Sequence, residues 1–253
     1  MKSRILKYKV SKKIPQRFEF PIVSKKRLIS KETTRASEKV FQASIEGIDD
    51  NEIQTGINRM VVVGFCALLN LKEILTRWEQ NREQLTTYLN EFIMSVTGII
   101  EEQGGIAERF EKNGILFFFG AEGIKQDDFT KAILSSLKIR YRMNKLNRNW
   151  NFYHDDTWKA GIGMTAGTSY IIRHGTTRNC TYSIKGELCL FTKGLGSSAG
   201  SSQIIITEEM IKNPLFPKNT FEVKNPFHIQ AQGIDYVTRV REIVALIKGK
   251  EVI

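Results

Sequence analysis

Apolar positions along this chain change their spacing from one segment to the next, and the spacing predicts the type of each element. A continuous, largely β-branched run over residues 60–66 predicts a strand buried on both faces. Residues 83–102 carry apolar side chains three and four positions apart, which predicts an amphipathic helix. Asn113 and Gly114 lie between two apolar runs and predict a hairpin. The expected elements are a strand at 60–66, helices at 71–78 and 83–102, strands at 107–111 and 115–119, a helix at 127–146, and strands at 157–165, 181–184 and 202–207.

These elements follow one another as strand, helix pair, hairpin, helix and strand, which is the order of a βαββαβ ferredoxin-like core. The strands expected after residue 180 are additional to that core. We therefore expect an α/β fold, arranged as an α+β sandwich with extra C-terminal strands, over residues 56–253. Many unrelated functions use this core, so the element order alone does not indicate an activity.

Basic residues are concentrated ahead of the predicted fold. Residues 1–40 hold 13 Lys and Arg against 3 acidic residues, whereas the whole chain has a formal net charge of +11. The rest of the chain is therefore nearly neutral. A neutral body argues against the fold itself being a nucleic-acid reader, because such domains carry a basic face. Residues 1–55 keep neither a helical nor a strand period, and we expect them to form an extended or partly disordered basic arm.

Aromatic residues interrupt the charge of this arm. Phe18 and Phe20 stand just before Lys25, Lys26 and Arg27. The mixture is too apolar for a purely solvating tail and too charged to form a core alone. We therefore predict that these residues bind a partner, either a protein groove that takes the phenylalanines or an acidic surface that attracts the cations.

Cysteine usage and hydropathy indicate a compartment. Three cysteines without paired spacing favour reduced thiols over a disulfide framework or a zinc site. The longest apolar runs are far shorter than the roughly 18 residues that a membrane span needs. The N-terminal cations are not followed by an apolar stretch, so a secretory signal is not expected. A cytoplasmic protein without a membrane span is the expectation.

Three segments in register resemble the catalytic domain of class III adenylate and guanylate cyclases. The sequence MVVVGFCALLNLK at 60–72 is similar to the first strand of that family. The sequence GGIAERFEKNGILFFFG at 104–120 is similar to its hairpin, and 160–206 to its later part, including GIGMTAG and YSIKGELCLFTKGLG. Each segment alone is a weak signal, but their order and spacing agree over residues 58–245.

The resemblance implies a definite chemistry. A nucleoside triphosphate is closed into a 3′,5′-cyclic monophosphate with the help of two divalent metals, which are Mg²⁺ or Mn²⁺. Two Asp residues hold these metals, and a partner chain of a head-to-tail dimer supplies an Asn and an Arg to the transition state.

Every one of those catalytic positions is changed in this chain. The two metal-binding Asp positions fall at Ala67 and Asn113, and the Gly before the second is Lys112. The Asn position reads Leu190 and the Arg position reads Gly194. Alanine offers no ligand, and a neutral amide is a poor ligand for a hard dication. Lys193 is adjacent to the Arg position, but one helical residue turns the side chain by about 100°, so we do not expect it to substitute.

The positions that select the base are also altered. The slot that is Lys in adenylate and Glu in guanylate cyclases falls at Arg109, and its companion falls at Ser183. Together with Lys112 these are the candidate nucleotide-binding residues, if any nucleotide binds. For Arg109 the alternative is a surface strand residue that pairs with a neighbouring acid.

The preferred interpretation is a catalytically inactive cyclase-homology domain that acts in protein association, regulation or scaffolding, with no cofactor. We expect it to form a homodimer, or a heterodimer with a cyclase-type chain. The alternative is an active cyclase whose metal-binding Asp residues at 67 and 113 have been mutated, and only that alternative calls for Mg²⁺ or Mn²⁺. Asp→Ala and Asp→Asn are the changes commonly used to trap a substrate complex.

Overall fold

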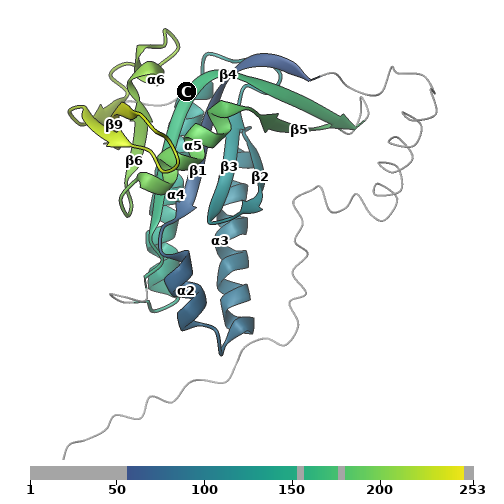
Figure 1. The fold of residues 1–253 in the computed structure, drawn as a ribbon, viewed down its shortest axis with the longest axis vertical. Coiled ribbons are helices and arrows are strands. Elements are labelled where there is room, and N and C mark those ends of the chain that lie inside the picture. Colours follow the sequence, from purple (N-terminus) through teal and green to yellow (C-terminus); the bar gives the residue numbers. More distant parts are fainter. Residues whose placement is uncertain (1–55, 153–156, 176–179, 248–253) are drawn as a thin grey trace, which may run out of the picture.

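A central strand with two antiparallel neighbours organises the fold. In the computed structural model, which describes residues 56–152, 157–175 and 180–247, β1 (Ile57–Leu68) lies between β3 (Gly114–Phe119) and β4 (Ala160–Gly175). The sheet has nine strands, in the order β2-β3-β1-β4-β6-β9-β7, with β5 paired to β4 and β8 to β9 (Figure 1). The other elements are α2 (Leu71–Arg77), α3 (Arg82–Glu102), β2 (Ile106–Glu111), α4 (Asp128–Asn149), β5 (Cys180–Lys185), α5 (Glu187–Ser198), β6 (Ile204–Thr207), α6 (Glu208–Lys212), β7 (Phe221–Val223), β8 (Phe227–Gln230) and β9 (Val237–Leu246).

This order confirms the expected ferredoxin-like core with added C-terminal strands, because β4, β1, β3 and β2 are neighbours in the sheet. The basic arm, with Phe18, Phe20, Lys25, Lys26 and Arg27, lies outside the described residues. Its partner-binding role and the division of the chain at residue 55 stay predictions. Within the described part of the chain, no helix combines the length and the apolar character that a membrane crossing requires.

Two details differ from the sequence expectation. The strand expected at 157–165 begins at Ala160 and continues to Gly175, because its second half pairs with β5 in a ribbon that extends from the body (Figure 1). The polar residues of that half had concealed the strand. In the hairpin, Glu111 pairs with Gly114. The two-residue loop is therefore Lys112 and Asn113, and Lys112 adopts the left-handed conformation with φ 55°.

Both faces of β1 are buried from Val61 onward, as the continuous apolar run predicts. Alternate side chains, including Val62 and Cys66, join the core formed with the inner faces of α3 and α4. The intervening ones, including Phe65 and Ala67, join a smaller core that contains Cys189 of α5. Helices therefore cover the sheet on two sides, α3 and α4 on one and α5 on the other (Figure 1).

Helix α5 approaches the sheet more closely than side chains would allow. A Cβ atom on Gly163 of β4 would lie 2.4 Å from the backbone nitrogen of Gly196 in α5. A Cβ on Gly196 would lie 2.5 Å from the carbonyl oxygen of Phe65 in β1. Helix and sheet thus touch backbone to backbone, and glycine is required because no Cβ fits between them.

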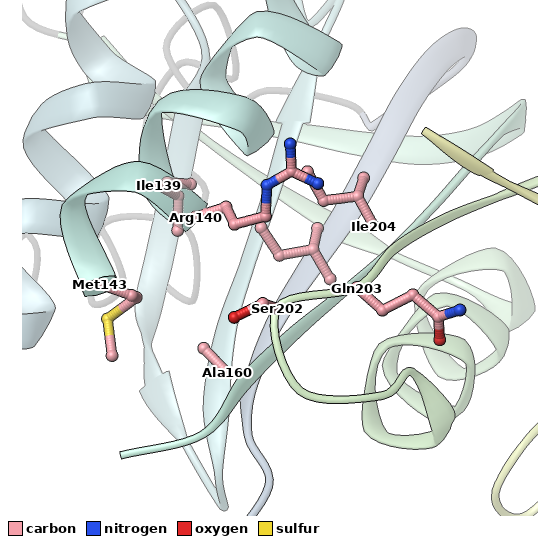
Figure 2. Close-up of a pocket in the computed structure, with 8 residues that line it drawn as sticks. Ile139, Arg140, Met143, Ala160, Ser202, Gln203 and Ile204 are labelled. Carbon is pink, nitrogen blue, oxygen red and sulfur yellow. The ribbon is translucent and has the colours of Figure 1, made fainter. Parts of the chain in front are cut away.

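Residues of α4 and of the segment before β6 enclose a small cavity (Figure 2). It is lined in part by Arg140 and Met143 of α4 and by Ala160 and Gln203, and its volume is about 10 Å³. That is roughly the room that one water molecule needs. The cavity is therefore a packing defect of the core and not a ligand site.

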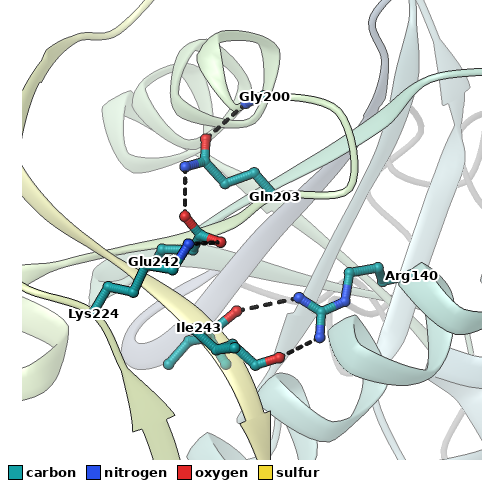
Figure 3. Close-up of polar contacts among 7 residues, drawn as sticks. Arg140, Gly200, Gln203, Lys224, Glu242 and Ile243 are labelled. Carbon is teal, nitrogen blue, oxygen red and sulfur yellow. Dashed lines mark hydrogen bonds and ion pairs between the residues drawn. The ribbon is translucent and has the colours of Figure 1, made fainter.

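Beside this cavity a polar network ties three segments together (Figure 3). The side chain of Gln203 accepts a hydrogen bond from the Gly200 amide at 2.8 Å and donates one to Glu242 of β9 at 2.9 Å. Lys224 pairs with the same carboxylate at 3.1 Å. Burial acts to raise the pKa of Glu242, but the hydrogen bonds from Gln203 and Lys224 and the charges of Lys224 and Arg140 outweigh it and lower that pKa.

The same arginine fastens α4 to β9. Arg140 donates to the backbone carbonyl oxygens of Ile243, at 3.3 Å, and of Val244. These contacts hold the C-terminal strands against the helical layer and explain why an arginine is tolerated in a partly buried position.

The backbone contact between α5 and the sheet predicts a sharp difference between two glycines. Gly163→Ala should destabilise the protein by at least about 1–3 kcal/mol, because the new methyl group meets backbone that cannot move aside. Gly98→Ala in α3 should stabilise it by up to about 1 kcal/mol, because Gly98 has nothing within 4 Å and lies in a helix interior. Denaturant unfolding of the two variants measures both effects. Equal stabilities would contradict the described packing of α5.

Candidate functional site

The fold brings together the two positions that the resemblance assigns to metal ligands. Ala67 at the end of β1 pairs with Gly114, the residue directly after Asn113. The amide of Leu68 donates to the carbonyl oxygen of Asn113 at 2.6 Å. The side-chain amide of Asn113 in turn donates to the carbonyl oxygen of Leu68 at 3.3 Å. The hairpin loop is thus fastened to the end of β1 by hydrogen bonds in both directions.

Each of these two residues has a structural role. The Ala67 side chain is fully buried and packs with Leu116 and Cys189 in the smaller core. Asn113 uses its NH₂ group on Leu68, which an aspartate could not do because a carboxylate only accepts hydrogen bonds. Lys112 is exposed beside them and brings a positive charge to the place where cations would have to bind.

This pair of residues does not fit a two-metal centre. Ala67 has no ligand atom, and the one oxygen of the Asn113 amide is neutral, whereas Mg²⁺ and Mn²⁺ prefer carboxylate oxygens. Over residues 56–152, 157–175 and 180–247 the structure contains no group of three or more His, Cys, Asp or Glu residues arranged to hold a metal ion.

The base-selecting candidate Arg109 engages an acid on its own strand. Its Nε donates to Oε1 of Glu111 at 2.8 Å, and its side chain remains 85% exposed. Lys193 of α5 contacts the other carboxylate oxygen of Glu111 at 3.4 Å. The hydrogen bond from Arg109, supported by the hydrogen bond and charge of Lys193, holds the pKa of Glu111 below its usual range. In this structure Arg109 therefore forms the surface pair that the sequence left open as the alternative.

The other candidate at the base-selecting position, Ser183, is engaged by a residue of β4. Ser183 of β5 shares a hydrogen bond of 2.7 Å with the ring nitrogen Nε2 of His174 on β4. A different residue, Glu108, joins β2 to β5 by accepting the backbone amide of Ile184 at 3.1 Å. Arg109 and Ser183 thus lie on neighbouring elements, but none of these contacts joins one to the other.

The two α5 positions that the resemblance assigns to the transition state have different surroundings. The Leu190 side chain is 65% exposed. Gly194, one turn later, is buried against the segment after β8, where a Cβ would lie 2.4 Å from the carbonyl oxygen of Gln232. The amide of Gln232 also donates to the carbonyl oxygen of Gly194 at 3.3 Å. The place of an arginine side chain is therefore filled by backbone.

The two buried thiols do not substitute for the catalytic groups that the resemblance implies. Burial raises the pKa of the Cys66 thiol to about 12. Burial also raises the pKa of Cys189, which packs in the smaller core. A thiol acts as a nucleophile only as its thiolate, so both cysteines are inert at neutral pH.

Two important residues escaped the sequence analysis. Glu111 lies two residues after Arg109 in a strand, so the period of two that places both on one face could have identified the pair. Gln232 gave no local signal, because it meets Gly194 only through the tertiary fold.

Comparison with solved structures identifies the fold. The chain is similar to the guanylyl cyclase Cya2, with 19% identity and a TM-score of 0.65 over 79% of this chain and 98% of the other. It is similar to the adenylyl cyclase CyaB from P. aeruginosa, with 18% identity and a TM-score of 0.66 over 78% and 100%. It is also similar to a non-canonical dimeric guanylyl cyclase domain of the RhoGC fusion protein from the aquatic fungus Blastocladiella emersonii, with 15% identity and a TM-score of 0.59 over 76% and 99%.

Residues from β1 to β9 therefore have the fold of adenylyl and guanylyl cyclase domains, as the sequence resemblance implied. No protein-family model matches the sequence, and no protein of curated function matches it.

The contact at Gly194 predicts how the protein responds when the residues that the resemblance implies are introduced on α5. Gly194→Arg should lower the melting temperature by several degrees or prevent folding, because the side chain would displace the Gln232 backbone. Leu190→Asn, on the same helix face but exposed, should change it by less than about 2 °C. Thermal unfolding followed by circular dichroism compares the two. A fully stable Gly194→Arg protein would show that the segment after β8 yields easily.

Proposed function

We propose that this domain is a catalytically inactive cyclase-homology domain whose cyclase-type surface serves protein association. The observation that carries the proposal is the contact between Gly194 and the Gln232 backbone. This contact removes the space for a transition-state arginine on α5. Metal ions bound at the other side of the site, on this chain or on its partner, would not replace that arginine.

The metal positions support the same proposal. Ala67 packs in the smaller core, and the Asn113 side chain holds the hairpin loop to β1 by a hydrogen bond. Neither residue has the negative charge that attracts divalent cations. Reverting two residues would restore carboxylates but leave Leu190 and Gly194 as they are. The alternative of an active cyclase mutated at 67 and 113 requires that these two α5 positions be dispensable.

Association is supported by apolar side chains around the altered Asn position. Leu190 is 65% exposed, and Tyr236 and Val237 in the adjoining segment are 60% and 61% exposed. The ring of Phe191 stacks on Tyr236 with centroids 6.2 Å apart, which joins α5 to that segment. Large exposed apolar groups that lie together indicate an interaction surface. One protein with this fold is described as a dimeric guanylyl cyclase domain, and we propose that the present chain pairs with a second copy or with a cyclase-type chain.

Restoring the metal acids separates the two candidate functions. We expect the unaltered protein, Asn113→Asp and Ala67→Asp/Asn113→Asp to form no cyclic nucleotide from any of the four triphosphates with Mn²⁺, because the α5 positions remain altered. Chromatography of the products measures this, with the guanylyl cyclase Cya2 as the positive control.

The single variant Asn113→Asp guards against misfolding, since Ala67→Asp places a carboxylate in a fully buried position. Circular dichroism establishes which variants fold. Cyclic product from the double variant alone would establish the mutated-cyclase alternative. Product from the unaltered chain would end the proposal of an inactive domain.

If the domain associates through this apolar surface, its mass in solution should depend on Leu190. Light scattering at tens of micromolar should give the mass of a dimer. Leu190→Asn should shift this mass toward that of the monomer, because it places a polar amide in an apolar contact. Leu75→Asn is the matched control, because Leu75 on α2 is 47% exposed but far along the chain from α5. A monomeric unaltered protein would contradict the homodimer and leave only pairing with a different cyclase-type chain.

A further inference from the structure

Helix α4 carries a charge that the near-neutral composition of the body conceals. After Asp128 in its first turn the helix contains no acidic residue. It contains six basic residues, Lys131, Lys138, Arg140, Arg142, Lys145 and Arg148. The acids that balance them lie on other elements, including Glu83, Glu91, Glu101 and Glu102 on α3.

Three of the six cations have partners. Lys131 pairs with Asp127 at 2.6 Å. Arg140 is committed to backbone carbonyl groups of β9. Arg142 donates to the hydroxyl of Ser95 at 3.2 Å and lies 3.9 Å from the carboxylate of Glu91. These three cations are therefore engaged within the domain.

The other three cations form an exposed stripe. Lys138, Lys145 and Arg148 are exposed, and none of them makes an ion pair or side-chain hydrogen bond with any other residue that the structure describes. Tyr141, which is 66% exposed, stands between them. Spacings of three and four residues put all four side chains on one helix face, over about 15 Å. We call Lys138, Tyr141, Lys145 and Arg148 the α4 cationic face.

Helix stability does not account for this face. Like charges three or four residues apart repel, so an acid at one of these positions would stabilise the helix. The helix dipole favours cations only in the last turn, and Arg148 is the one basic residue there. Lys138 and Lys145 lie within the helix, where that effect has faded.

We infer that the α4 cationic face binds single-stranded nucleic acid, with Lys138, Lys145 and Arg148 on backbone phosphates and a base stacked on Tyr141. A row of cations that follows a phosphate chain, with an exposed ring for unpaired bases, is the chemistry that recognises single strands. An anionic membrane fits less well. A helix that lies in a membrane interface inserts its apolar face, and the apolar face of α4 is buried in the core through Ile133, Ile139 and Leu146.

This surface is separate from the one proposed for association. The α4 cationic face belongs to the helical layer on one side of the sheet, and Leu190 belongs to α5 on the other (Figure 1). The inference therefore does not depend on the domain being inactive or dimeric.

The test uses the full chain and a fluorescently labelled 30-nucleotide single strand of mixed sequence, with binding followed by anisotropy over a range of salt concentrations. Lys138→Glu/Lys145→Glu/Arg148→Glu should weaken binding at least tenfold at low salt. It should also reduce the slope of log K against log salt by about 2, since each phosphate contact on a single strand contributes roughly 0.7. Tyr141→Ala should weaken binding about tenfold without changing the slope, and Tyr141→Phe should restore it.

The matched control is Lys72→Glu/Lys185→Glu/Lys218→Glu, which changes the net charge equally at exposed lysines away from α4. All variants keep residues 1–55, so any binding by the basic arm is common to them, and circular dichroism confirms that each is folded. An equal loss in both triple variants would overturn the inference. So would absence of binding by the unaltered protein, tighter binding of duplex with no effect of Tyr141→Ala, or binding only to phosphatidylserine vesicles.

Discussion

The backbone contact between α5 and the sheet determines what the rest of the site can be. At Gly163 and Gly196 helix and strand meet with no side chain between them, so α5 can neither roll nor slide without a clash. That orientation turns Leu190 outward, sends Lys193 to Glu111 on β2, and presses Gly194 against the segment after β8. The surroundings of the α5 positions therefore follow from how the helix packs on the sheet.

The positions that the resemblance assigns to catalytic groups have structural roles in this chain. Ala67 fills a fully buried position in the smaller core, Asn113 donates to the end of β1, and Gly194 admits the Gln232 backbone. An aspartate at either of the first two positions would introduce a charge or lose a donor. The present residues are therefore favoured by the fold itself, and introducing a carboxylate or an arginine at one of these positions would lower the stability.

Much of the fold could be predicted because its periodic signals are strong. The buried run of β1 and the apolar face of α3 are local patterns, and both elements lie where the patterns placed them. The second half of β4 was missed because its polar residues belong to a two-stranded ribbon that buries little. The closure of Gly194 by Gln232 could not be predicted, since it depends on how the chain returns to α5 after β8. Charge on α4 was hidden for another reason: a net sum over the whole body cancels cations on one helix with acids on its neighbour.

The sheet separates two surfaces with opposite character. Leu190, Tyr236 and Val237 are exposed apolar groups on the α5 side, whereas the α4 cationic face lies on the other side. Between them lies β1, which is buried on both faces and paired with a neighbour on each edge. Because the two surfaces lie on opposite sides of this strand, occupation of one leaves the other accessible. If both proposed surfaces are occupied, the domain holds two different partners on opposite sides of one sheet, which is a role that would use this fold without nucleotide cyclisation.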